Sequence, residues 1–109
     1  MKPTRYYSSK QEEYVAKLVN GKTVPGSGSP HFCCGDVVTK NWLFECKTTT
    51  KPKESFSIKK EWLDKNEKER MGLQKLYSAL VFQFKEDGTN YFVINESLFK
   101  EMMEVFNGE

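Results

Sequence analysis

Two acidic residues and a lysine in the first half of the chain have the types and the spacing of a phosphate-hydrolysing metal site. Asp36 is followed farther along the chain by Glu45 and Lys47, which are separated by one residue. Carboxylate oxygens suit Mg²⁺, which proteins usually hold through one or two carboxylates together with substrate phosphates. A lysine beside such an ion can orient or deprotonate a water. That combination is the chemistry of metal-assisted phosphodiester hydrolysis.

A β-hairpin is predicted to bring these three side chains together. Two apolar runs flank the polar residues 39–41, which is typical of two strands joined by a turn. Asp36 opens the first strand, and Glu45 and Lys47 project from the same side of the second because side chains alternate along a strand. The alternative is a solvated strand face, with Asp36 serving only as a turn residue. The apolar run 42–46 favours a site, because charges in such a strand need partners or a metal.

Length and composition predict one compact folded domain over residues 1–109. The net charge is only +2, so any basic surface must come from local segregation of lysines rather than from the whole chain. The sequence has no apolar run of membrane-spanning length and no apolar signal segment after its first residues. We therefore expect a soluble, cytoplasmic protein without a membrane partner.

The cysteines suggest buried thiols. There are three, Cys33, Cys34 and Cys46, and an odd number with two adjacent members does not fit a secreted disulfide framework. A zinc site that also uses His31 is an alternative. However, the chain has no C-x-x-C pair, and adjacent cysteines rarely both ligate one tetrahedral ion.

A helix is predicted over residues 8–19, beginning with possible N-cap serines and ending at Asn20-Gly21. Glu12 shares the inward, apolar face with Val15, because residues three and four apart lie on one side of a helix. Glu13 is turned away from that face. The alternative for Glu12 is a helix-start role, in which an acidic residue stabilises the first turn.

Five further elements are predicted after the hairpin, and their alternation of strands and helices is typical of an α/β domain. They are a short strand at 55–58, a helix from 59 to about 76 weakened by Gly72, strands at 77–84 and 91–94 joined by an Asp87-Gly88 turn, and a final amphipathic helix at 97–106.

Two polar segments have the composition of phosphate-contacting surfaces. The loop 25–30 contains Gly26-Ser27-Gly28, whose glycines permit close backbone approach and whose hydroxyl could meet a phosphate, although a connecting loop has the same composition. The second segment is basic and carries Lys51, Lys53, Lys59 and Lys60. These lysines form either a surface that contacts phosphates or a solvated face.

The order of these motifs resembles the PD-(D/E)XK nuclease superfamily, and in particular the small Holliday junction resolvases of archaea and phages. The resemblance covers residues 8–100, and glycine at position 35 replaces the family's proline. The matching motifs are Glu12-x-x-Val15, Gly26-Ser27-Gly28, Gly35-Asp36, Glu45-x-Lys47-Thr48 and the segment 56–63.

That resemblance implies a restriction-endonuclease-like core, with a central mixed β-sheet of about five strands flanked by helices. It also implies that Asp36, Glu45 and the Cys46 carbonyl hold Mg²⁺, for which Mn²⁺ can substitute. Glu12 would ligate a second metal directly or through water. Lys47 would position the attacking water and stabilise developing negative charge.

The implied partner is DNA, most often a four-way junction or another branched form, bound by a homodimer whose two-fold symmetry supplies a second site. The setting would be the cytoplasm of a bacterial, archaeal or phage-infected cell. Alternatives are a flap, nicking or single-strand nuclease of repair or replication, and an inactive nuclease-like DNA-binding module. The implied DNA contacts are Gly26, Ser27, Gly28, Thr48, Lys51, Lys53, Lys59, Lys60 and Gln74, the last on the helix after the third strand.

Overall fold

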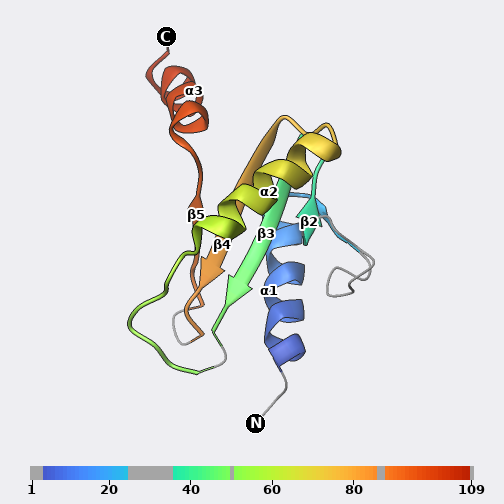
Figure 1. The fold of residues 1–109 in the computed structure, drawn as a ribbon, viewed down its shortest axis with the longest axis vertical. Coiled ribbons are helices and arrows are strands. Elements are labelled where there is room, and N and C mark those ends of the chain that lie inside the picture. The colour runs from blue at the N-terminus through green and yellow to red at the C-terminus, as the bar shows by residue number, and fades with distance from the viewer. Residues whose placement is uncertain (1–3, 25–35, 50, 86–87, 109) are drawn as a thin grey trace.

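The computed structural model describes residues 4–24, 36–49, 51–85 and 88–108, which form three helices and one five-stranded sheet (Figure 1). The predicted α/β class with a central mixed sheet flanked by helices is confirmed. The elements are α1 (Thr4–Leu18), β1 (Lys22–Thr23), β2 (Val37–Val38), β3 (Trp42–Thr48), α2 (Lys60–Gly72), β4 (Tyr77–Gln83), β5 (Asn90–Val93) and α3 (Glu96–Asn107).

The strands follow chain order across the sheet, β1-β2-β3-β4-β5. β2 and β3 form the predicted antiparallel hairpin, in which Val37 pairs with Phe44. β3 and β4 are parallel, so the chain must cross over between them, and α2 is that crossover. The remaining neighbours, β1 with β2 and β4 with β5, are antiparallel.

Helix α1 packs on one face of the sheet. Its buried Val15 joins Phe44, Cys46 and Val81 in the main hydrophobic cluster. Since successive strand residues point to opposite faces, Glu45 and Lys47 project from the other face, where α2 lies.

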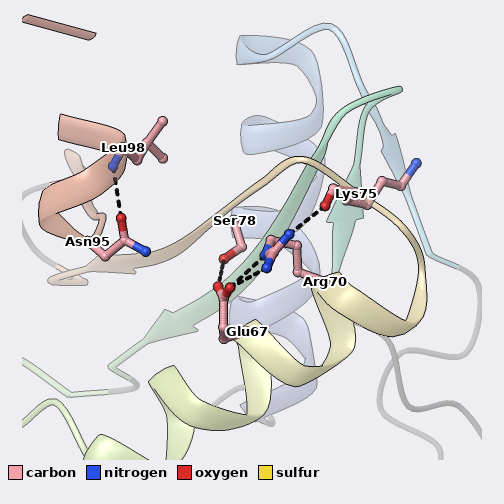
Figure 2. Close-up of polar contacts among 6 residues, drawn as sticks. All are labelled: Glu67, Arg70, Lys75, Ser78, Asn95 and Leu98. Atoms are coloured by element: carbon pink, nitrogen blue, oxygen red, sulfur yellow. Dashed lines mark hydrogen bonds and ion pairs between the residues drawn. The ribbon is translucent and has the colours of Figure 1, made fainter. Parts of the chain in front are cut away.

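A polar network holds the end of α2 against the start of β4. Figure 2 shows the Glu67 carboxylate accepting hydrogen bonds from the Arg70 guanidinium and from the Ser78 hydroxyl, the latter at 3.3 Å. Arg70 Nη1 also donates to the Lys75 carbonyl at 2.8 Å. The hydrogen bond to Arg70 lowers the pKa of Glu67, because it favours the charged carboxylate.

Helix α3 extends away from the sheet at the end of the molecule that carries the C-terminus (Figure 1). The Asn95 side chain caps its first turn by accepting a hydrogen bond from the Leu98 N–H at 2.9 Å (Figure 2). Leu98 is the buried member of this helix, whereas Val105 and Phe106 are about three-quarters exposed. Most of its predicted apolar side therefore does not contribute to the core.

Several predicted boundaries were wrong. α1 begins at Thr4 rather than at the serines, because nothing from Thr4 to Leu18 interrupts a helix. Residues 55–58 form no strand, and α2 ends at Gly72 rather than near residue 76. β4 ends one residue earlier than predicted, and β5 and α3 each begin one residue earlier. In the described part of the chain, no helix is long and apolar enough to cross a membrane.

Candidate functional site

Asp36 is anchored to the strand that carries the other two candidate residues. Its backbone N–H donates to the Phe44 carbonyl at 2.9 Å, and its carboxylate Oδ2 accepts from the Cys46 N–H at 2.7 Å. β2 is only two residues long, so the Asp36 side chain takes the place of a further strand partner for β3. The result is a buried carboxylate held against the backbone between Glu45 and Lys47.

Glu45 and Lys47 lie together on the α2 face of β3, as predicted. The Lys47 ammonium is 3.7 Å from Glu45 Oε1, and the two side chains are only 29% and 15% exposed, respectively. They line a pocket of about 390 Å³ whose other walls are Glu61, Trp62 and Lys65 from α2. This pocket is where a substrate group could reach the carboxylate and the ammonium.

The pocket raises the proton affinity of Glu45. Burial raises the pKa of its carboxyl to about 7, the negative charge of Asp36 contributes in the same direction, and Lys47 and Lys65 oppose the change. Two nearby carboxylates therefore repel each other in a partly buried site. A cation bound between them would relieve that repulsion.

The donor atoms here fit a hard cation. Because the N–H and C=O of one strand residue point toward the same neighbouring strand, the Cys46 carbonyl faces the side where Asp36 lies. Two carboxylates and one carbonyl are oxygen ligands of the kind that Mg²⁺ accepts. No group of three or more His, Cys, Asp or Glu side chains able to hold a metal occurs in residues 4–24, 36–49, 51–85 and 88–108.

Glu12 points inward as predicted and is only 5% exposed, whereas Glu13 is exposed. The negative charge of Glu12 helps to raise the pKa of the Cys46 thiol. Glu12 therefore lies near Cys46, on the α1 side of the sheet. It does not join Asp36 and Glu45 in a three-carboxylate group. Its role toward a second metal stays a prediction.

The Cys46 thiol is free and buried, as predicted, and burial raises its pKa far above the ordinary value. A protonated, buried thiol is a packing group rather than a metal ligand. His31, Cys33, Cys34 and the Gly26-Ser27-Gly28 loop lie outside the described residues.

A basic groove adjoins the pocket. It has a volume of about 770 Å³, and its lining includes Lys51, Lys53, Lys59, Thr48 and Trp62. The structure thus brings together three of the four lysines predicted to contact DNA, and Thr48 with them. The fourth does not line this groove: Lys60 forms an exposed ion pair with Asp64 at 2.8 Å.

Gln74 is not brought to this site. It lies beyond α2 in a left-handed turn, with φ of 57°, and its side chain is exposed. The following Leu76 N–H donates to the Asn41 carbonyl, just before β3 begins. The prediction that placed Gln74 on a helix was wrong, and the turn lies at the opposite end of β3 from Lys47.

A second cavity, of about 300 Å³, lies at that opposite end, between α2 and α3. Glu67, Arg70, Ser78 and Asn95 line it, and Figure 2 shows the contacts that each of them makes. The Glu67 carboxylate is already bonded to Arg70 and Ser78. In this cavity the Glu67 carboxylate is therefore already neutralised by Arg70, and Glu101 is the other acidic residue of the lining.

Two residues of the site were not predicted, Gln11 and Trp62. Gln11 is fully buried, and its Nε2 donates to the Lys47 carbonyl at 2.9 Å and to Asn90 Oδ1 at 3.1 Å. The sequence did carry a signal for its burial, because Gln11 lies four residues before the apolar Val15 and so on the same face of the helix. The Trp62 ring lies 4.5 Å from the Lys47 ammonium, a proximity that depends on the β3-α2-β4 crossover and has no signal in local spacing.

Comparisons with protein-family models, with curated proteins and with solved structures find no match to this chain. The side chains gathered where the start of β2 meets the end of β3 are therefore the evidence for what this protein does.

Proposed function

We propose that this protein is a Mg²⁺-dependent endodeoxyribonuclease that cuts branched DNA, with the Holliday junction as the foremost substrate. The observation that carries the proposal is the group of side chains where the start of β2 meets the end of β3. There the Asp36 carboxylate is bonded to the Cys46 backbone, and Glu45 and Lys47 form an ion pair in a pocket. The intact trio favours an active enzyme over an inactive DNA-binding module.

The protein groups would divide the chemistry among them. Asp36, Glu45 and the Cys46 carbonyl would hold Mg²⁺, which supplies charge neutralisation at the scissile phosphate, and Mn²⁺ would substitute. The Lys47 ammonium can donate hydrogen bonds to a water or to a phosphate oxygen. Its ion pair with Glu45 orients it in the pocket while leaving donor capacity for that purpose. Lys47 is thus suited to position the attacking water and to stabilise negative charge.

A four-way junction presents two strands that must be cut symmetrically, while the described residues of one chain form one such site. A homodimer with two-fold symmetry would supply both sites. Lysines of the adjoining groove, Lys51, Lys53 and Lys59, would contact phosphates beside the scissile bond. The proposed setting is the cytoplasm of a bacterial, archaeal or phage-infected cell.

The test is cleavage of a labelled four-way junction with Mg²⁺ or with EDTA. We expect cleavage by the wild type only with the metal, and loss of at least about 100-fold in rate for Lys47→Ala and Glu45→Gln. Lys100→Ala on α3 is the matched control, because it removes an exposed lysine away from the pocket. Undiminished cleavage by Glu45→Gln would show that the site is elsewhere.

A nuclease that cuts flaps or single strands is the second candidate. The aromatic ring of Trp62 between the pocket and the basic groove favours it, because unpaired bases can stack on such a ring. Cleavage rates on junction, flap, duplex and single-stranded DNA of matched length separate the two candidates.

A further inference from the structure

Aromatic rings form a contiguous row on the face of the sheet that carries the site. Phe82 pairs with Lys47 in the parallel register, so both side chains lie on the α2 face. The Phe56 ring stacks on Phe82 at 5.3 Å between centroids and lies 6.3 Å from Trp62. Tyr91 also stacks on Phe82, at 5.3 Å between centroids. The row therefore ends, on the side of the site, at Trp62.

Trp62 lines two adjoining hollows, one of mixed charge and one basic. It lines the pocket that contains Glu45 and Lys47, and together with Phe56 it also lines the basic groove. Its ring lies 4.5 Å from the Lys47 ammonium and 5.6 Å from that of Lys59. A group that rests on this ring would therefore be close to the proposed catalytic lysine.

The groove supplies positive charge along its length. Lys51, Lys53 and Lys59 are exposed and line it. Of these, Lys59 lies near the Trp62 ring. At an exposed position, the stacking of a base on an aromatic ring is more favourable than the contact of a lysine with that ring. A base could thus replace Lys59 at the ring and leave its ammonium for a phosphate.

We propose that this groove binds an unpaired DNA segment, with Trp62 as the platform for one unstacked base and the three lysines as phosphate contacts. The inference rests on the proposed nuclease function and narrows its branched substrates to those with unpaired nucleotides next to the cut, namely flaps and junctions whose base pairs are open at the branch point. A continuous duplex keeps its bases stacked on each other, so it can use the lysines but not the ring. Stacking on Trp62 therefore discriminates unpaired from paired DNA, which phosphate contacts alone cannot do.

The experiment measures binding without cleavage. The full-length protein in EDTA is titrated into a labelled thymidine oligonucleotide of about 12 nucleotides, within the range that such grooves accommodate, and into a duplex of equal length. Fluorescence anisotropy gives both affinities. Tryptophan emission of the wild type and of Trp62→Phe reports whether the ring meets a base.

We expect the single strand to bind more tightly than the duplex and to quench the Trp62 emission. Trp62→Leu should weaken single-strand binding about tenfold or more and change duplex binding less than about twofold, whereas Trp62→Phe should keep most of the single-strand affinity. The double variant Lys51→Ala/Lys53→Ala should weaken both and reduce the salt dependence of both.

An equal loss of both affinities in Trp62→Leu, or no loss of either, would overturn the inference. Circular dichroism of each variant guards against misfolding, and the Trp62→Phe and lysine variants test the groove if Trp62→Leu does not fold. Failure here with Mg²⁺-dependent junction cleavage intact would leave the proposed function standing. Absence of cleavage on every DNA form would instead refute that function.

Discussion

The Asp36 carboxylate accepts a 2.7 Å hydrogen bond from the backbone N–H of Cys46, across the end of the β2-β3 hairpin. This bond serves two purposes. It gives the buried Cys46 N–H an acceptor, which β2 is too short to supply from its backbone. It also holds a negative charge beside Glu45, and that charge helps to raise the pKa of Glu45. The structural and the electrostatic roles of Asp36 can therefore be separated by mutation.

Asp36→Asn should remove function and keep the fold. The amide oxygen can still accept from the Cys46 N–H, but the charge is lost, so we expect at least about 100-fold slower junction cleavage with little change in melting temperature. Asp36→Ala should in addition cost about 1–3 kcal/mol in the free energy of unfolding, because the buried N–H loses its partner. Cleavage rates and urea unfolding of both variants test this, and equal stability of the two would contradict it.

The stability of the metal-free protein should fall as pH rises through the range in which Glu45 ionises. The pKa of Glu45 is raised from 4.5 to about 7 in the folded chain, so the folded state binds more protons than the unfolded state between those values. The contribution of Glu45 to stability is fully present below pH 4.5 and is lost as the pH rises to about 7. The free energy of unfolding should fall by about 3 kcal/mol over this range. Urea unfolding in EDTA at a series of pH values measures it. Glu45→Gln should flatten this part of the curve, and an unchanged slope in that variant would refute the assignment.

Mg²⁺ should stabilise the protein most where Glu45 is ionised. Binding to the folded state alone adds about 2.7 kcal/mol when the ion is at 100 times its dissociation constant. We expect a rise in melting temperature on adding Mg²⁺ above neutral pH and a smaller rise below it, because the metal competes with the proton on Glu45. Asp36→Asn should lose most of this effect. A similar rise in that variant would place the metal elsewhere.

The hairpin and its three charged residues could be predicted because the signals are local. A polar turn between two apolar runs determines which residues pair, and strand alternation determines that Glu45 and Lys47 share a face. Residues 55–58 also alternate, yet no strand forms there, because a strand needs a neighbour that local pattern does not provide.

The end of α2 shows the same limit in a helix. Leu73 to Leu76 are acceptable helix formers, but the Leu76 and Tyr77 N–H groups both donate to the Asn41 carbonyl, and Arg70 bonds to the Lys75 carbonyl. These contacts, of which the two to Asn41 are long-range, turn the chain into β4 and carry Gln74 out of the helix. The proximity of Trp62 to Lys47 depends on the same crossover, so it too required the structure.

Gln11 should be more important for stability than its exposed neighbours. It is 1% exposed, and its amide bonds to the Lys47 carbonyl and to Asn90, which joins α1 to β3 and β5. Gln11→Met keeps the approximate volume but removes these bonds, so we expect a loss of about 1–3 kcal/mol. Glu13→Ala on the exposed side of the same helix is the control and should change stability by less than about 0.5 kcal/mol. Equal effects in urea unfolding would contradict the assigned role of Gln11.

Two glycines should respond in opposite directions to replacement by alanine. A Cβ on Gly21 would lie 2.6 Å from the Val38 carbonyl oxygen, a backbone atom that cannot move without disturbing β2. Gly21→Ala should therefore destabilise the protein by about 1–3 kcal/mol. At Gly72, the last residue of α2, a Cβ meets nothing within 4 Å, and alanine favours the helix by up to about 1 kcal/mol. Melting temperatures of the two variants test the pair. A stabilised Gly21→Ala would show that the connection between α1 and β1 does not approach β2 as closely as the structure indicates.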